Sequence, residues 1–266
     1  MKIGASLVLI QETLYAANQD VVFALDAATG KIRWKDQSNT QTYYPVKNML
    51  VENNIIVIIR DGFVKGVQAS DDHQLWTIDQ TTPLSSFGGD AVLHELHVCN
   101  VFATATILYM CLTSTPGASS NQQASFAAYA LPTGKLLWNV QDAAAKDPAL
   151  SFTFQNPFAP TAITKDGIFA LTEPDNGDLE ARSLQDGHTL WTKLGTGSYP
   201  GITVEDGRIY TETDNGELDV FTIKDGARLW TLSAISGTYW LNQTLYIEKN
   251  YDGKLDLQRR SSSEAR

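Results

Sequence analysis

The sequence predicts an all-β fold, a β-propeller built from four-stranded antiparallel blades. The first observation is a repeat, because five times an extended run ends in a tight polar turn that is followed closely by a tryptophan. These tryptophans are Trp34, Trp76, Trp138, Trp191 and Trp230. The second is the period of roughly 40 to 60 residues, since four short strands with their turns need about 40. The third is composition, with 10% aromatic and only 19% charged residues, which excludes a disordered or coiled-coil chain.

One repeat, residues 202–232, shows the elements most clearly. Its strand-like segments are 202–205, 208–213, 217–223 and 228–232. The turns between them contain Asp206-Gly207, Asn215-Gly216 and Asp225-Gly226. Asp-Gly and Asn-Gly pairs supply the positive φ that short hairpins need, and the β-branched and aromatic residues between them suit a pleated sheet. The segment therefore predicts a meander of four antiparallel strands.

The same template along the chain predicts six blades in a single propeller domain, residues 1–266. They are expected at about 7–40, 47–80, 91–142, 160–195, 201–234 and 238–260. The sixth blade has no closing turn and no terminal tryptophan, so it stops one strand short. Either residues 1–6 supply the missing strand and close a six-bladed ring, or the chain is part of a seven- or eight-bladed ring. Both alternatives cover a sheet edge that would otherwise invite association.

The acidic balance of the chain argues against two classes of partner. The formal charge is −10 and no basic stripe is visible, whereas nucleic acids and anionic membranes bind clustered Lys and Arg. Near the N-terminus, eight mostly apolar residues precede Gln11 and Glu12, and these are too few to cross a membrane. No small-residue cleavage site follows them. We therefore expect a first strand there, no membrane insertion and no nucleic-acid partner.

The polar turns carry a family resemblance. Residues 24–34, which read ALDAATGKIRW, resemble the tryptophan-docking motif of the PQQ-like, or quinoprotein-type, bacterial β-propellers. Residues 128–138, AYALPTGKLLW, match it except at the acidic position, and the other three copies keep the acidic residue and the tryptophan but lose the lysine. The resemblance implies that each tryptophan wedges between neighbouring blades as a structural docking residue. It also implies a periplasmic or extracellular location, although the chain shows no signal peptide.

Resemblance to this family does not by itself imply catalysis. Family dehydrogenases carry a vicinal cysteine pair near the quinone, whereas Cys99 and Cys111 lie twelve residues apart. Their catalytic aspartate and calcium ligands have no counterpart that we can place. The chain resembles instead the non-catalytic branch of binding platforms, for which we expect no catalytic residue and no cofactor. The alternative function is a quinone- or metal-dependent oxidoreductase.

Other chemical motifs are weak. His94, His97 and Cys99 are metal-ligand types, but in a strand the two histidines would point to opposite faces. We interpret this segment as a surface loop that leads into a strand, and expect no metal site. Acidic turns such as Asp175-Asn176-Gly177 lack the oxygen spacing of a calcium loop. Cys99 and Cys111 are interpreted as buried thiols, with a cross-strand disulfide as the alternative.

Three insertions, residues 80–96, 114–125 and 141–160, interrupt the template around the third blade. In a meander, the connection between the second and third strands leaves on the same side as the connection to the next blade, so all three insertions are expected on one face. Long loops on a rigid scaffold often bind partners. We therefore expect a recognition lip that binds a protein or a small molecule of unknown identity. Its aromatic anchors would be Phe87, Phe152, Phe154 and Phe158, unless these side chains only fold the loops back onto the propeller.

Overall fold

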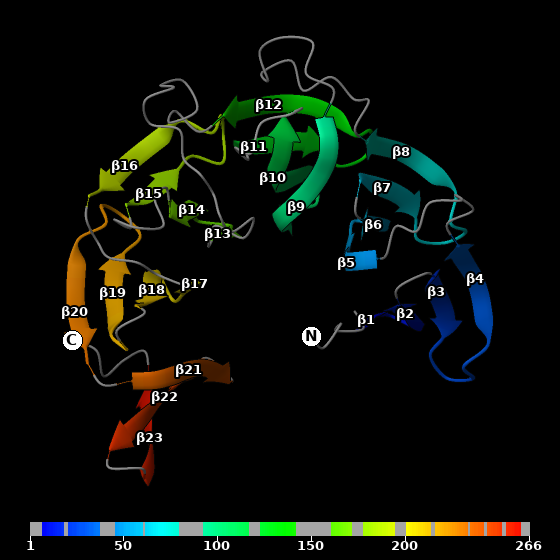
Figure 1. Ribbon diagram of the computed structural model, residues 1–266. Helices are drawn as coiled ribbons and strands as arrows, with labels where there is room; N and C mark the ends of the chain where they lie inside the picture. The colour runs from blue at the N-terminus through cyan, green and yellow to red at the C-terminus, as the bar shows by residue number, and fades with distance from the viewer. Residues whose placement is uncertain are drawn as a thin grey trace. The chain divides into compact units, whose positions relative to one another are not determined.

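The computed structural model describes residues 7–18, 21–37, 46–60, 62–79, 93–116, 123–141, 161–171, 178–194, 201–213, 216–233, 235–241, 244–251 and 254–261. Regular structure in these ranges consists of β-strands alone, joined by turns and bends. Within them, no helix has the length and hydrophobicity that a membrane crossing requires. The strands form six antiparallel sheets, which confirms the predicted all-β class (Figure 1).

The chain divides into two units, Met1–Thr153 and Phe154–Arg266, and the first contains three four-stranded sheets. Sheet 1 consists of β1 (Leu7–Ile10), β2 (Thr13–Ala17), β3 (Val21–Asp26) and β4 (Ile32–Gln37). Sheet 2 consists of β5 (Val46–Glu52), β6 (Ile55–Arg60), β7 (Phe63–Gln68) and β8 (Gln74–Asp79). Sheet 3 consists of β9 (Leu93–Ala103), β10 (Ile107–Pro116), β11 (Gln123–Ala130) and β12 (Lys135–Gln141).

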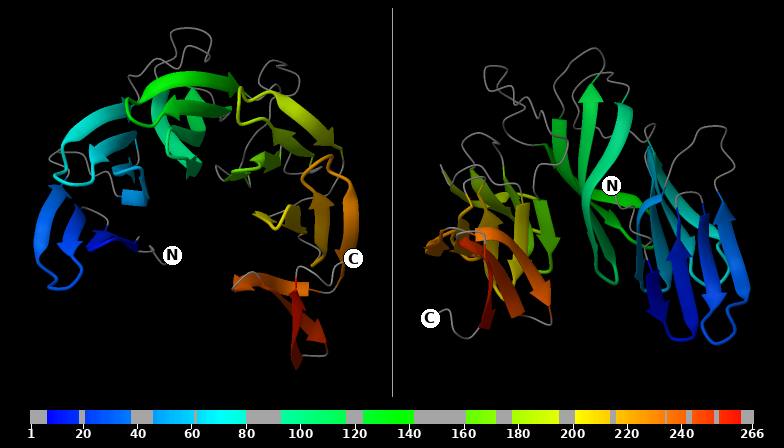
Figure 2. Two further views of the ribbon diagram at one scale, coloured as in Figure 1. Left: turned by 180° about the vertical axis from the view of Figure 1, so that it is seen from behind. Right: turned by 60° about the horizontal axis from the view of Figure 1, so that its bottom comes forward.

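The second unit contains the other three sheets. Sheet 4 consists of β13 (Thr161–Thr164), β14 (Gly167–Leu171), β15 (Leu179–Arg182) and β16 (Thr189–Lys193). Sheet 5 consists of β17 (Gly201–Glu205), β18 (Arg208–Glu212), β19 (Leu218–Thr222) and β20 (Arg228–Leu232). Sheet 6 has three strands in the described residues, β21 (Ile235–Leu241), β22 (Thr244–Tyr251) and β23 (Lys254–Ser261). In all six sheets the strands lie in chain order, as the meander predicts (Figure 2).

Each sheet of the first unit packs face to face on the next, with sheet 2 between the other two. Strand β6 shows why, because all six of its residues are buried. Ile56 and Ile58 pack in a cluster with Trp34 of sheet 1, whereas Val57 and its neighbours pack in a cluster with Leu108 of sheet 3. A strand covered on both faces accounts for the continuous apolar run that the sequence has here. Equivalent clusters join sheets 4 and 5 and sheets 5 and 6 in the second unit.

The five repeated tryptophans share one position, on the fourth strand of sheets 1 to 5. Each pairs with a residue of the third strand, in order Ala24, Gly66, Ala128, Ala181 and Val220. Four of these partners are small because the indole lies across the third strand. At Gly66, for example, a Cβ atom would lie only 2.2 Å from Trp76 Cε2. The tryptophan on the fourth strand therefore requires a small residue opposite it on the third strand.

Three of the indoles reach the following sheet. Trp34 Nε1 donates a hydrogen bond to the Ala69 carbonyl of sheet 2 (2.9 Å), and Trp76 Nε1 donates to the Leu131 carbonyl of sheet 3 (2.7 Å). In the second unit, Trp191 Nε1 donates to the Ile223 carbonyl (3.1 Å). Every acceptor is the first residue after a third strand, so the contact recurs at the same place. A buried indole contributes a large apolar area and needs a partner for its N–H, and here one contact supplies both.

A β-bulge directly precedes each of the five tryptophans. Ala24 pairs with Trp34 but Leu25 pairs with Ile32, which leaves Arg33 as the extra residue of the fourth strand. The same shift occurs in sheets 2 to 5. The extra residues there are Leu75, Leu137, Leu190 and Leu229, with 36%, 49%, 53% and 46% of their surface exposed. In sheets 2 to 5 the bulge therefore leaves one leucine exposed on the fourth strand.

Replacing Trp76 by alanine should lower the free energy of unfolding by about 3–5 kcal/mol, because it empties a buried volume between sheets 2 and 3. Urea denaturation followed by circular dichroism measures this loss. The control is Leu137→Ala at a half-exposed bulge position of sheet 3, which should change the value by less than about 0.5 kcal/mol. A loss below about 1 kcal/mol for Trp76→Ala would contradict the assigned packing.

Candidate functional site

The four predicted aromatic anchors cannot be placed. Phe87, Phe152, Phe154 and Phe158 all lie outside the described residues, as do residues 80–92, 117–122 and 142–160 of the insertions. What the structure describes is the point from which each insertion leaves sheet 3. These points define the candidate site, and we refer to them below as the open end of sheet 3.

Strand pairing brings the open end together from four strands. Leu93, where β9 begins, pairs with Pro116, where β10 ends. On the other side, Ser114 of β10 pairs with Gln123, where β11 begins. Gln141, the last residue of β12, pairs with Ser125 of β11. The three connections that the sequence predicts to be long thus all leave from one end of a single sheet.

Sheet 3 is also extended toward this end. Strands β9 and β10 have 11 and 10 residues, whereas the strands of sheet 1 have between 4 and 6 (Figure 2). The prediction that residues 114–125 form a loop throughout is wrong at both ends, because 114–116 and 123–125 are strand. Strand β10 extends into the insertion because β9 is long enough to pair with it as far as Pro116. The insertion therefore lengthens a hairpin and leaves a shorter connection at its tip.

The histidine segment is likewise strand. His94 and His97 lie in β9, where the His97 backbone pairs with Thr113, so their interpretation as a surface loop is wrong. The pairing with the extended β10 holds this segment in the sheet. Among the residues whose placement is described, no three His, Cys, Asp or Glu side chains come together as a potential metal site.

A disulfide crosslinks this hairpin. Cys111 of β10 is 2% exposed and is disulfide-bonded, and the chain has only one other cysteine, Cys99 of β9. The interpretation of the two cysteines as buried thiols is therefore wrong, and the cross-strand alternative is correct. The register explains the pairing, because Val98 pairs with Leu112 and Asn100 with Cys111. This bulge makes Cys99 the extra residue of β9, directly beside Cys111.

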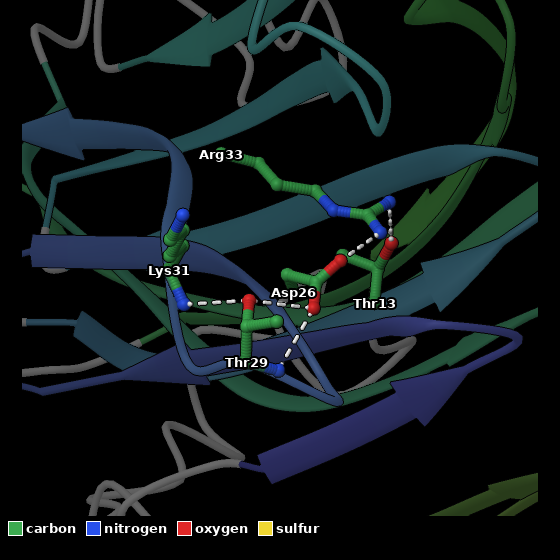
Figure 3. Close-up of polar contacts among 5 residues, drawn as sticks. All are labelled: Thr13, Asp26, Thr29, Lys31 and Arg33. Carbon is green, nitrogen blue, oxygen red and sulfur yellow. Dashed lines mark hydrogen bonds and ion pairs between the residues drawn. The ribbon is translucent and has the colours of Figure 1, made fainter.

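The acidic turn residues of the motif serve the backbone. In the turn of sheet 1, Asp26 Oδ1 accepts hydrogen bonds from the Thr29 backbone N–H (2.9 Å) and hydroxyl (2.8 Å), as Figure 3 shows. Arg33 donates to Asp26 Oδ2 (2.7 Å) and also to the Thr13 hydroxyl (2.8 Å). The Lys31 backbone N–H donates to Thr29 Oγ1 (3.4 Å). The motif therefore contains Asp26 and Thr29 because their side chains form the hydrogen bonds that stabilise the turn.

These hydrogen bonds set the acidity of Asp26. Donation from the Arg33 side chain, with further donation from the Thr29 hydroxyl and backbone N–H, lowers the pKa of Asp26 from 3.8 to about 2. The equivalent region of sheet 5 behaves similarly, because the Thr222 hydroxyl donates to Asp225 and lowers the pKa of that carboxyl. Both groups are therefore held in the ionised form as hydrogen-bond acceptors, which is the opposite of what a general acid needs.

The charged side chains of the described residues include two close ion pairs, one partly buried and one buried. Lys65 of sheet 2 lies 2.6 Å from Asp36 of sheet 1, and thereby joins two sheets. Within sheet 4, Arg182 Nε lies 2.6 Å from Glu180 Oε1, and both side chains are 5% exposed. The arrangement satisfies each of these charges inside the packed sheets.

Comparison with known proteins gives one family. The family model described as outer membrane protein assembly factor BamB matches residues 1–108 and 119–245. No curated protein matches the chain in sequence. The matched ranges include all five repeated tryptophans, so the predicted resemblance to PQQ-like propellers is confirmed.

Solved structures show the same fold at low sequence identity. BamB from Moraxella catarrhalis superposes with a TM-score of 0.58 at 15% identity, covering 94% of this chain and 73% of that one. A europium-containing methanol dehydrogenase gives 0.55 at 12% identity, covering 90% of this chain and 51% of that one. Hsv2 from Kluyveromyces lactis gives 0.53 at 10% identity, covering 92% and 71%. The chain thus spans about half the length of the dehydrogenase and nearly three quarters of the other two.

Acid titration should reveal the Arg33–Asp26 contact. Because the pKa of Asp26 in the folded state lies below its ordinary value, this group contributes stability above about pH 4 and loses that contribution as the pH falls toward 2. Arg33→Leu should raise the pKa of Asp26 toward its ordinary value, which carboxyl-carbon NMR measures. Lys31→Leu is the matched control, since only the Lys31 backbone takes part in the turn. An unchanged pKa in Arg33→Leu would refute the assignment.

Reducing the disulfide should destabilise sheet 3. The bond closes a loop of roughly a dozen residues, for which the loss is about 2–3 kcal/mol. Thermal unfolding with and without a phosphine reductant measures the change, and a melting temperature lower by several degrees is expected. A Cys99→Ala/Cys111→Ala variant should show no response to the reductant. Equal melting curves of the natural protein in both conditions would exclude a stabilising bond.

Proposed function

Because the chain belongs to the PQQ-like repeat family whose model is described as outer membrane protein assembly factor BamB, we propose that it is a non-catalytic β-propeller that serves as a protein-binding scaffold. The proposal takes the open end of sheet 3 as the binding surface and places the recognition lip there, with Phe87, Phe152, Phe154 and Phe158 as its anchors. The partner is a protein, in keeping with the assembly role that the family description states.

The observation that carries this proposal is the convergence of three long connections on one sheet end. Leu93, Pro116 and Gln141 mark where they depart, and the paired strands hold these points in fixed register. Binding loops work best on a rigid base, because the base does not have to be ordered when the partner arrives. The extended β9–β10 hairpin and its disulfide supply that rigidity at the base of the lip.

Two further observations support a scaffold rather than an enzyme. Asp26 and Asp225, which belong to the motif turns, are used as hydrogen-bond acceptors within those turns. The disulfide favours a location in an oxidising compartment, such as the periplasm or the cell exterior, because such bonds are rare where thiols are kept reduced. Both observations fit a stable exported scaffold that recognises its partner through the long connections of sheet 3.

The alternative, a quinone- or metal-dependent oxidoreductase, rests on likeness in fold to a methanol dehydrogenase. It is tested by adding the quinone with calcium to the purified protein and recording the absorbance spectrum and the metal content. Retention of a stoichiometric chromophore after gel filtration would overturn the scaffold proposal.

Site-specific photo-cross-linking should locate the binding surface. A benzoylphenylalanine placed at residue 119, within the connection between β10 and β11, should give a discrete cross-linked protein band in cells. The control is the same group at Ala105, which is exposed in the opposite turn of the same sheet. Cross-linking of equal strength at both positions, or at neither, would contradict the proposed surface.

Shortening the hairpin provides an independent check of the same surface. Replacing residues 115–122 by Asn-Gly should close a two-residue turn on the Ser114–Gln123 pair. Because the change removes only the Pro116–Leu93 end of the ladder, the melting temperature should change little. A cross-link formed by benzoylphenylalanine placed at residue 87 should be lost. Persistence of that cross-link would show that the tip of the hairpin makes no contribution.

A further inference from the structure

Strand β9 departs from the two-residue repeat of a regular strand. Three of its residues, Val98, Val101 and Ala103, pack against the core shared by sheets 2 and 3. Val101 and Ala103 are two residues apart, as residues on one face of a strand are, but Val98 and Val101 are three apart. In a regular strand this odd spacing would place the two valines on opposite faces. An extra residue between them must therefore restore the common face.

The bulge at Cys99 supplies this extra residue. Val98 pairs with Leu112, and the next pair along the ladder is Asn100 with Cys111, so Cys99 has no position of its own in the ladder. An inserted residue displaces everything on its far side by one place. The bulge therefore decides which face of the strand each residue of β9 before Cys99 occupies.

A second register differs from the observed one by a single residue. If the ladder continued from the Asn100–Cys111 pair without a bulge, Cys99 would pair with Leu112 and Val98 with Thr113. Such a shift moves the start of β9 by about 3.3 Å along β10 and exchanges its two faces. A free thiol is small and apolar enough to take the place of Val98, which is only partly buried, against the core. The two registers thus bury similar surfaces.

The disulfide is compatible with only one of these registers. In the shifted register, Cys99 would be paired one place beyond the residue opposite Cys111. Successive positions of a ladder project to opposite faces, so the Cβ atoms of the two cysteines would point apart and could not be bridged. In the observed register, Cys99 lies beside Cys111 and the bond is formed. The bond therefore stabilises the bulged register, and reduction removes that stabilisation.

The register of β9 also affects the open end of sheet 3. Strand β9 begins at Leu93, where the connection formed by residues 80–92 arrives. The other two long connections leave from Pro116 and Gln141, which belong to strands that the shift does not move. A one-residue shift of β9 would therefore displace one of the three connections relative to the other two.

We propose that the Cys99–Cys111 disulfide is a redox-controlled register lock on the recognition lip. The oxidised chain holds the bulged register and binds its partner, whereas the reduced chain shifts residues 93–99 by one place and releases it. This inference rests on the proposed function, because it regulates the same surface.

The chemistry of the lock is thiol–disulfide exchange with a dithiol reductant. One thiolate of the reductant attacks the Cys99–Cys111 bond and forms a mixed disulfide, which the second thiol of the reductant then resolves. Two electrons and two protons pass to the chain, which is left with two thiols, while the reductant becomes a disulfide. Cys111 is 2% exposed, so β9 must first separate from β10. Because β9 is the terminal strand of the described sheet, it can open while the β10–β11–β12 ladder stays intact.

Cross-strand nuclear Overhauser effects in the isotope-labelled full chain report the register directly. In the oxidised chain, the backbone protons of Thr113 should contact those of His97. After reduction by a phosphine, the contact of Thr113 should move to Val98. The Phe102–Tyr109 pair lies on the other side of the bulge and should keep its contact in both conditions.

Two variants that both lack the bond provide a matched comparison, because they differ by one residue. The Cys99→Ala/Cys111→Ala variant keeps the extra residue and should show the shifted register with or without reductant. The second variant combines Cys111→Ala with deletion of Cys99. Without the extra residue, Val98 stays opposite Leu112 in a regular ladder, so this variant should keep the register of the oxidised chain in both conditions.

Benzoylphenylalanine at residue 87, in the connection that leads into β9, tests the effect on binding in cells. The Cys99→Ala/Cys111→Ala variant should give a cross-linked band about five-fold weaker than the natural chain or less, a typical size for coupling between two sites. The deletion variant should retain the band. Equal loss of the band in both variants would contradict the proposal, because the bond would then act by stiffening the hairpin and not through its register.

The spectroscopic measurement needs no partner, so it separates the lock from the proposed function. The proposal is wrong if the His97–Thr113 contact survives reduction, or if reduction abolishes every contact between β9 and β10. A register shift in a protein that gives no cross-link even as the natural oxidised chain would contradict the proposed function, and with it the control of binding by the lock.

Discussion

The fold depends on the contact between an indole and the turn of the next sheet. A sheet of four short strands with two apolar faces cannot bury both faces alone, so every sheet needs a neighbour. Trp76 meets this need with one side chain, since its ring covers Gly66 in its own sheet and Gly134 in the next. Its N–H also satisfies the Leu131 carbonyl. A phenylalanine could supply the area but not the donor, and the turn carbonyl would lose its partner.

The tryptophan repeat was sufficient to predict the fold because each indole constrains residues elsewhere in the sequence. Trp138 requires a small residue opposite it on the third strand, which is Ala128. The turn between these strands requires a residue of positive φ, which is Gly134 in sheet 3 and Asp72 in sheet 2. The same eleven residues therefore determine both the turn between the strands and the contact between sheets, so the motif predicts both.

The candidate site was less predictable, because what happens there depends on the register of two strands. Nothing within residues 114–125 reveals that β9 lies alongside them as far as Leu93. The Cys111 disulfide depends on a one-residue bulge in β9, which has no glycine or proline to mark it.

The bulge beside each tryptophan also has a consequence for how the protein behaves in a crowded solution. An outermost strand normally offers a straight row of N–H and carbonyl groups on which a strand of another molecule can grow. In sheets 1 to 5 that row is interrupted near the beginning of the fourth strand, at Arg33, Leu75, Leu137, Leu190 and Leu229. An incoming strand would lose its hydrogen-bond register at this bulge. The bulge that precedes each tryptophan thus also disfavours the growth of a fibril from the fourth strands, even though four of these strands carry an exposed leucine.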